Sequence, residues 1–272
     1  MQLTGPRAFG PPADRDEAVA VLRHAVARGV DHIDTAQYYG PDVANEILRE
    51  ALDPYPDGLR IDTKVGARRG PDGEWLPAAH PAELREQVEA NLRCLGLDRL
   101  SLVNLRVGGE GMPESDVPME ESLGALADLR AEGKIERLGL SAVTVEQLEA
   151  AAALTPIASV SNRYGVLDRT HQPVLDATVE RGIAFVPFFP LGSAFMGGPA
   201  KLAKDPAIAE VAAKHGATPA QVALAWLLAL APNVEPIPGT ASRTHLDENL
   251  DAEALRLDAD DLSRLRSLHP VV

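Results

Sequence analysis

Three residues near the start of the chain combine the groups that proton donation in a positive field requires: Asp34, Tyr39 and Lys64. A phenol donates a proton, an ammonium ion stabilises negative charge that develops on oxygen, and a carboxylate holds the ammonium ion in place. An ordinary phenol has a pKa near ~10, and a neighbouring cation lowers it. The pattern predicts that Tyr39 donates a proton, that Lys64 lowers its pKa, and that Asp34 positions Lys64 as an ion pair.

Each of these residues lies at or just beyond the end of a short apolar segment that is typical of a β-strand. Strand-like segments alternate with amphipathic segments rich in Ala and Glu, which indicates βα units around a parallel sheet. In a parallel barrel the catalytic groups gather at the carboxyl ends of the strands. The three side chains are therefore expected at one edge of the sheet.

The alternation predicts an α/β protein in which residues 1–272 form a single (β/α)8 barrel domain. The eight predicted strands are Met1–Thr4, His32–Ala36, Leu59–Val65, Leu100–Arg106, Arg137–Ala142, Ser159–Tyr164, Ala184–Pro190 and Asn233–Gly239. The predicted helices are Asp16–Arg28, Val43–Ala51, Ala82–Leu95, Met119–Ala131, Val145–Ala153, Pro173–Arg181 and Pro219–Ala231. Asp14 or Asp16 is the expected cap of the first helix, and Gly29 its end.

Composition excludes several classes of protein. The formal net charge of −14 disfavours binding to nucleic acid or to anionic lipid. Cys94 is the single cysteine, so no internal disulfide forms, and the histidines lack metal-ligand spacing. The amino terminus does not resemble a signal peptide, and the longest apolar run, Val222–Ala231, is shorter than the roughly 20 residues that span a bilayer. We expect a cytoplasmic protein without metal, nucleic-acid or membrane partners.

The run Asp34-Thr35-Ala36-Gln37-Tyr38-Tyr39-Gly40, followed by Lys64, resembles the Asp-Thr-Ala-x-x-Tyr-Gly motif and the strand-borne lysine of aldo-keto reductases. Further segments that resemble the family follow in its order: Gly133–Ser141, Val186–Gly192, Ile237–Thr240 and Glu248–Leu250. The resemblance implies an NADPH-dependent reductase that converts an aldehyde or ketone to an alcohol, with Tyr39 as proton donor. Tyr38 is the alternative donor, disfavoured because the family's tyrosine directly precedes the glycine. Relatives also carry an amino-terminal hairpin and a complete first strand. Here the hairpin and part of the first strand are expected either to be absent or to lie upstream of Met1.

Arg106 stands where most aldo-keto reductases have a histidine at the end of the fourth strand. Alternation along that strand places Asn104 and Arg106 on the same inward face. Arginine keeps its charge and cannot act as acid or base. Arg106 is therefore expected to stabilise the developing alkoxide or to hold an anionic group of the substrate. The string Asn104–Gly108 resembles a bacterial branch that includes pyridoxal reductases, and a guanidinium would complement the phenol oxygen of pyridoxal.

The resemblance also implies a nucleotide site, at which this chain departs from the family in several places. Ala142 and Ser161 replace the usual Asn and Gln at the nicotinamide carboxamide, and Phe188 replaces the stacking Tyr. Gly239 and His245 replace basic residues near the 2′-phosphate, so NADH is a possible second cofactor besides NADPH. The expected cofactor-binding residues are Ser141, Ser161, Asn162, Phe188, Leu191, Gly192, Ser193, Gly239, Thr240, Arg243, His245, Glu248 and Asn249.

Two long loops, Gly108–Pro118 and Gly192–Pro206, are expected to cover the substrate or cofactor. Trp75, in the predicted loop Gly66–Pro81, is either a wall of the substrate pocket or an exposed anchor. The expected partner is a small carbonyl compound, and the expected assembly a monomer or weak homo-oligomer. Two alternatives stay open. One is an NADPH-binding sensor barrel with little or no activity, and the other, by fold analogy, is an isomerase or lyase acting on phosphorylated sugars.

Overall fold

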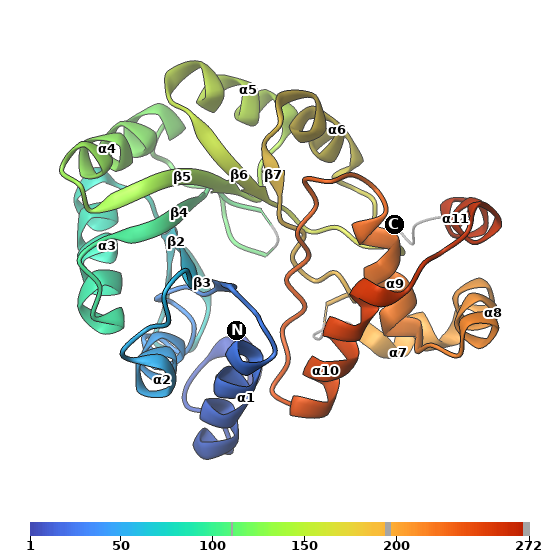
Figure 1. Ribbon diagram of the computed structural model, residues 1–272. Helices are drawn as coiled ribbons and strands as arrows, with labels where there is room; N and C mark the ends of the chain where they lie inside the picture. Colours follow the sequence, from blue (N-terminus) through green and yellow to red (C-terminus); the bar gives the residue numbers. More distant parts are fainter. Residues whose placement is uncertain (110, 194–196, 269–272) are drawn as a thin grey trace. The chain divides into compact units, whose positions relative to one another are not determined.

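The computed structural model describes residues 1–109, 111–193 and 197–268 (Figure 1). These residues form two compact units. The first contains residues 1–160 and 241–243, and the second contains residues 161–240 and those from 244 onward. Within the described ranges, no helix is long and apolar enough to cross a membrane. The prediction of one domain over the whole chain stays a prediction.

The first unit is built on neighbouring strands in the order β1 (His32–Asp34), β2 (Arg60–Arg69), β4 (Leu100–Arg106), β5 (Ile135–Ser141) and β6 (Ile157–Ser161), of which the last residue, Ser161, groups with the second unit. The pairings from β1 to β5 are parallel. Their register sets Asp34 opposite Asp62, Lys64 opposite Asn104, and Arg106 opposite Ser141. The polar side chains at the strand ends therefore come from adjacent strands, as the sequence predicts.

The helices of the first unit are α1 (Arg15–Ala27), α2 (Val43–Leu52), α3 (Pro81–Leu95), α4 (Met119–Ala131) and α5 (Val145–Leu154). Figure 1 shows α3, α4 and α5 on the outer side of the strands. Local signals fix their ends. The carboxylate of Asp14 accepts a hydrogen bond from the N–H of Glu17, Thr144 and Gln147 form a capping box, and Gly96 ends α3 in a left-handed conformation. These helices lie within two residues of their predicted bounds.

The predicted strand Met1–Thr4 is wrong. The chain instead begins in turns and the short 3₁₀ helix η1 (Pro6–Ala8), and the N–H of Gly5 donates to the carbonyl of Gly10 over 2.9 Å. Arg7 and Ala8 have positive φ angles of 60° and 56°. The hydroxyl of Thr4 donates to the carbonyl of Met1 over 2.8 Å, a local contact that holds these residues in a turn instead of an extended strand.

The predicted loop Gly66–Pro81 is also wrong in part. β2 continues to Arg69 and pairs antiparallel with β3 (Trp75–Ala78), which places Trp75 opposite Arg69 in a hairpin. The connecting Gly70-Pro71-Asp72-Gly73 sequence is a turn signal that could have revealed this hairpin. At Gly66, a Cβ atom would lie 2.6 Å from the carbonyl oxygen of Arg106, so a side chain there would disturb the neighbouring strand end.

In the second unit, the predicted strands are shorter than expected. β7 comprises Ala184–Phe185, and the predicted strand Asn233–Gly239 contributes an isolated bridge between Val234 and Phe185. Each predicted strand contains two prolines: Pro187 and Pro190 in the first, and Pro236 and Pro238 in the second. Each proline removes a ladder donor, which explains why apolar sequence did not become regular strand.

The helices of the second unit are α6 (Gln172–Arg181), α7 (Gly198–Lys204), α8 (Pro206–His215), α9 (Pro219–Leu228), α10 (Arg243–Asp251) and α11 (Ala259–Arg266), with a 3₁₀ turn η3 (Ala252–Ala254) before α11. Arg243, the first residue of α10, groups with the first unit. α7 lies within the segment predicted as the loop Gly192–Pro206, of which residues 194–196 lie outside the described part. Tyr164 stacks on Trp226 in the core, with ring centroids 6.0 Å apart.

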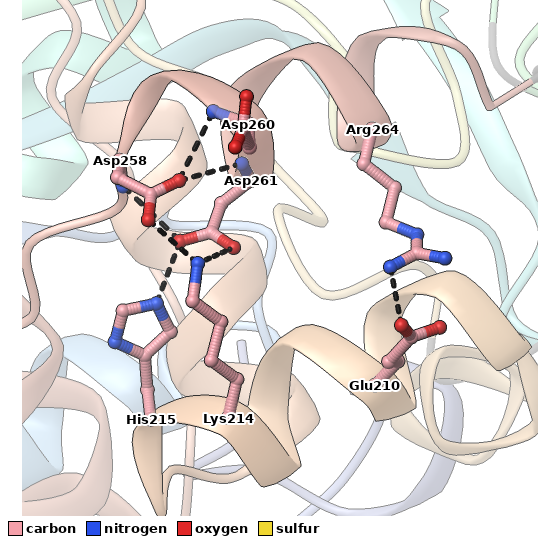
Figure 2. Close-up of polar contacts among 7 residues, drawn as sticks. All are labelled: Glu210, Lys214, His215, Asp258, Asp260, Asp261 and Arg264. Carbon is pink, nitrogen blue, oxygen red and sulfur yellow. Dashed lines mark hydrogen bonds and ion pairs between the residues drawn. The ribbon is translucent and has the colours of Figure 1, made fainter.

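Ion pairs with the buried carboxylate of Asp261 connect α11 to α8 (Figure 2). The Lys214 ammonium contacts Asp258 at 2.6 Å and Asp261 at 2.7 Å, and Nε2 of His215 lies 2.6 Å from the Asp261 carboxylate. The Asp261 side chain is 4% exposed. Burial alone would raise its pKa, but hydrogen bonds from Lys214, His215 and the backbone outweigh burial and lower that pKa to about 2.

Replacing Asp261 tests this attachment. We expect Asp261→Asn to lower the melting temperature at neutral pH by about 2–4 °C, because a buried acceptor loses its charge. Because folding lowers the pKa of Asp261, the stabilisation that its ionised carboxylate provides is complete above the ordinary pKa of 3.8. This stabilisation is lost as the pH falls toward 2. Thermal unfolding of the variant should therefore depend less on pH in that window. Asp260→Asn, at the exposed neighbouring position, is the control, and equal effects of both substitutions would contradict the assignment.

Candidate active site

A buried ion pair joins Lys64, within β2, to Asp34, at the end of β1. The two side chains are 4% and 10% exposed. Nζ of Lys64 also donates to the carbonyl oxygen of Thr35 over 3.2 Å. Two charges withdrawn from water need such close partners, because each alone would be strongly unfavourable. The two neighbouring strands therefore hold one ammonium ion in a fixed place.

A network of buried polar side chains supports the Lys64–Asp34 ion pair. The Thr35 hydroxyl donates to Asn45 over 2.9 Å, and the Asn45 amide donates to Asn91 over 2.9 Å. The Thr63 hydroxyl donates to the same Asn91 oxygen over 2.7 Å. Thr35 and Thr63 each adjoin one member of the ion pair, and Asn45 and Asn91 lie on α2 and α3. The network thus ties both strand ends to the helices that cover them.

Tyr39 lies beside the ion pair, with Nζ of Lys64 5.3 Å from the centroid of its ring. The tyrosine is 8% exposed. The chain turns directly after it, and the N–H of Gly40 donates to the carbonyl of Ala8 over 3.0 Å. Gly40 has a φ angle of 96°, and a Cβ atom there would lie 2.5 Å from that of Val43. Glycine is therefore required where the backbone presents Tyr39.

The pKa of Tyr39 is raised, which corrects the expectation that Lys64 lowers it. Burial is the largest cause, the negative charge of Asp34 acts in the same direction, and Arg106 acts in the opposite one. Asp34 neutralises much of the field of Lys64, so desolvation of the phenolate prevails. The phenol stays protonated at neutral pH, which is the form that donates a proton.

Tyr38 and Trp75 form the apolar side of the site. They belong to or pack against a cluster of Ala8, Ala36, Tyr38, Tyr39, Ala44, Ala67 and Met112. Tyr38 makes edge-to-face contacts with Tyr39 and with Trp75, each with ring centroids 5.3 Å apart. Trp75 is thus a wall beside the tyrosines. Met112 was missed by sequence reasoning, because a single methionine in the Gly- and Pro-rich loop Gly108–Pro118 carries no signal.

Arg106 ends β4 on the same side of the unit. Its Nη2 donates to the carbonyl of Gly109 over 3.1 Å, and its Nη1 lies 3.5 Å from the Ser141 hydroxyl. One residue pair earlier on the strand, Asn104 accepts a hydrogen bond from Ser159 over 2.9 Å. The charge of Arg106 acts on the Tyr39 phenol. A phenol, an ammonium ion and a guanidinium thus lie on the same side of the first unit, and the positive charge of Arg106 acts on the phenol.

Two of the expected cofactor-binding residues, Ser141 and Arg243, belong to the first unit. Ser141 is fully buried at the end of β5, and the next residue, Ala142, has a φ angle of 58°. Asn favours this left-handed conformation more than Ala does, which agrees with the Asn of relatives at this position. Arg243 is fixed by α1: its Nε and Nη2 donate to the two carboxylate oxygens of Glu17 over 3.1 and 3.2 Å.

The other expected cofactor residues lie in the second unit. Ser161 and Asn162 are fully buried, and Nδ2 of Asn162 lies 3.1 Å from Nδ1 of His171. Phe188 donates its N–H to the Asn162 carbonyl over 3.0 Å. Leu191, Gly192 and Ser193 follow it, Gly239 and Thr240 precede α10, and His245, Glu248 and Asn249 lie on α10, with His245 exposed.

Neither the Cys94 thiol nor a metal ion has a role in this description of the site. Burial raises the pKa of the Cys94 thiol to about 11, so it stays a thiol rather than a nucleophilic thiolate. Across the residues that the structure describes, no group of His, Cys, Asp or Glu side chains is arranged to hold a metal ion.

Comparison with known proteins identifies the family. The chain matches the model of the aldo/keto reductase family over residues 1–270. It is 51% identical over 266 residues to pyridoxine 4-dehydrogenase of Escherichia coli strain K12, covering 97% of this chain and 91% of the relative. It is 35% identical to an uncharacterized oxidoreductase of Schizosaccharomyces pombe, covering 97% and 83% of the two chains.

Solved structures give the same result. A thermostable aldo-keto reductase in complex with the inhibitor epalrestat has a TM-score of 0.82 at 29% identity, covering 98% of this chain and 92% of that one. An aldo/keto reductase from Klebsiella pneumoniae in complex with NADP and acetate has a TM-score of 0.81 at 27% identity, covering 99% and 88%.

The chain therefore belongs to the aldo/keto reductase family. Within the family, its resemblance to the bacterial branch that includes pyridoxal reductases is confirmed by the Escherichia coli relative. The prediction of an oxidoreductase with an α/β (β/α)8 barrel fold is confirmed as well. The predicted absence of the amino-terminal hairpin stays a prediction.

Removing one charge of the buried pair should cost more than removing both. We expect Asp34→Asn to lower the free energy of unfolding by about 3–5 kcal/mol, because Lys64 is left charged and buried. The double variant Asp34→Asn with Lys64→Met should recover part of that loss, since no unpaired charge remains. Urea unfolding of the parent, the single variant and the double variant measures this. Glu89→Gln, which removes an exposed partner of Lys134, serves as a control with little effect. A double variant less stable than Asp34→Asn would contradict the buried-charge account.

Proposed function

We propose that this protein reduces an aldehyde or ketone to an alcohol with NADPH, and that Tyr39 donates the proton. The observation that carries the proposal is the protonated Tyr39 phenol beside the buried Lys64–Asp34 pair, with Arg106 acting on the same phenol. NADPH, when bound, supplies a hydride to the carbonyl carbon. The carbonyl oxygen gains the electron pair of the broken π bond and takes the Tyr39 proton.

The chain's own residues then have separate tasks. Tyr39 keeps its proton until the carbonyl oxygen gains negative charge, because burial raises its pKa. Lys64 stabilises the phenolate that remains, and Asp34 keeps the ammonium ion within reach. Arg106 supplies further positive charge but no proton, because a guanidinium does not titrate at physiological pH. Tyr38, Trp75 and Met112 exclude water from the apolar side.

Buried polar groups in the second unit fit a nicotinamide carboxamide. The Ser161 hydroxyl is fully buried and has no hydrogen-bond partner among the described residues. A buried hydroxyl without a partner is costly, so its presence favours a polar ligand at this position. Asn162 and the Phe188 ring are the neighbouring groups that would hold and face the nicotinamide.

We propose pyridoxal as the substrate, with pyridoxine as the product of reduction. The Escherichia coli relative, half of whose aligned residues are identical, is named for the pyridoxine reaction. A fixed guanidinium at Arg106 complements the ionisable phenol oxygen beside the aldehyde of pyridoxal. A small-molecule carbonyl partner, a cytoplasmic location and a monomer or weak homo-oligomer stay predictions.

Tyr39→Phe tests the proton donor. We expect kcat for pyridoxal reduction to fall by roughly 10²–10⁴-fold, the usual share of a general acid. NADPH binding, followed by the change in nucleotide fluorescence, should stay within about twofold, because the ring is kept. Tyr38→Phe is the matched control and should keep most of the parent's kcat. Parent-like turnover by Tyr39→Phe would disprove the donor role. NADPH binding by the parent without turnover of any aldehyde would favour the sensor alternative.

Arg243 tests the choice between NADPH and NADH. We expect Arg243→Ala to weaken NADPH binding by about tenfold and to leave NADH binding unchanged, because a charge-assisted contact to the 2′-phosphate is lost. Arg243→Lys, which keeps the charge but not the fork that pairs with Glu17, should lie between the parent and Arg243→Ala. Titration of each variant with both nucleotides measures the effect. An equal loss for NADH and NADPH would remove Arg243 from the phosphate site.

A further inference from the structure

Arg69, near the turn of the β2–β3 hairpin, joins this hairpin to residues 7–9 near the amino terminus. Its guanidinium carbon lies 4.1 Å from the ring centroid of Trp75 and 5.1 Å from that of Phe9. Its N–H groups donate to the carbonyl oxygens of Arg7, over 3.1 Å, and Ala8, over 2.7 Å, and to that of Gly73 within its own hairpin turn, over 2.5 Å. A planar guanidinium is suited to this combination of two stacking faces and several donors.

The first connection from Arg69 to the site passes through the backbone. The carbonyl oxygen of Ala8 accepts hydrogen bonds from Nη1 of Arg69 and from the N–H of Gly40. Gly40 directly follows Tyr39. Arg7 and Ala8 have positive φ angles that are uncommon for residues with a side chain, so bonds from outside the segment must hold them. Arg69 supplies two of those bonds.

The second connection passes through aromatic rings. Arg69 stacks on Trp75, Trp75 contacts Tyr38 edge to face, and Tyr38 contacts Tyr39 in the same manner. Trp75 is a member of β3, and its backbone is paired with that of Arg69 itself. Arg69 thus fixes the far end of a row of rings that ends at Tyr39.

We propose that Arg69 is a positioning residue for Tyr39, which holds the phenol in place through the Ala8 carbonyl and through Trp75 without touching the substrate. This inference rests on the proposed role of Tyr39 as proton donor. Arg69 acts by geometry rather than by charge, because the charges that act on the Tyr39 phenol are those of Asp34 and Arg106. A small displacement of a catalytic group is enough to slow a reaction considerably.

The test compares Arg69→Lys and Arg69→Gln with the same substitutions at Arg68, the exposed neighbour on the same strand. We expect kcat for pyridoxal to fall by about tenfold in both Arg69 variants, with the KM for pyridoxal and the affinity for NADPH within about twofold of the parent. Lysine should not rescue, because it cannot stack and bond to three carbonyls at once. The Arg68 variants should match the parent. A folded Arg69→Lys variant with the kcat of the parent would overturn the inference.

Two further measurements separate positioning from loss of the fold or of the proposed function. Phe9→Leu removes one stacking face and leaves the hydrogen bonds of Arg69, so we expect a fully folded protein with a smaller fall in kcat. In the double variant Tyr39→Phe with Arg69→Lys, kcat should equal that of Tyr39→Phe, because no proton donor remains to be positioned. If the two substitutions together lowered kcat by the product of their separate effects, the positioning role would be overturned. A parent-like Tyr39→Phe would instead disprove the proposed function.

Discussion

The ion pair of Lys64 and Asp34 is the interaction on which the first unit depends. Both charges are almost fully withdrawn from water, and neither can be kept there without the other. Their contact requires β1 and β2 to hold a fixed register, and the Thr35, Asn45, Asn91 and Thr63 network ties that register to α2 and α3. Charge burial therefore fixes the strands, the strands fix the turn after Asp34, and this turn presents Tyr39.

The same burial determines the chemistry of Tyr39. A lysine close to a phenol suggests a lowered pKa, but the paired carboxylate cancels much of the field and the apolar cluster disfavours the phenolate. The phenol is therefore held in its protonated form, which the proposed proton donation requires. Arg106 adds positive charge at the end of β4, where its guanidinium donates to the carbonyl of Gly109 and lies 3.5 Å from the Ser141 hydroxyl. In the proposed reaction, Lys64 and Arg106 both stabilise the oxyanion.

Much of the fold was predictable because its signals are local. Asp14, the Thr144–Gln147 capping box and Gly96 fix helix ends through neighbours in sequence, and the predicted bounds agree closely. Strands were harder, because pairing depends on partners far along the chain. Apolar composition suggested regular strands at 184–190 and 233–239, where prolines interrupt the ladder. The hairpin of β2 and β3 was missed because its polar sequence shows little alternation.

The sequence by itself determined the residue types of the site and their order along the chain: Asp34, Tyr39, Lys64 and Arg106 are recognisable from motif and spacing, and so is the family. The tertiary structure decided what each group can do. Only in three dimensions does Met112 reach the tyrosines, Arg69 join Ala8 to Trp75, and Glu17 fix Arg243. The physical reason is that pKa, orientation and desolvation depend on contacts between residues far apart in sequence, which local patterns do not encode.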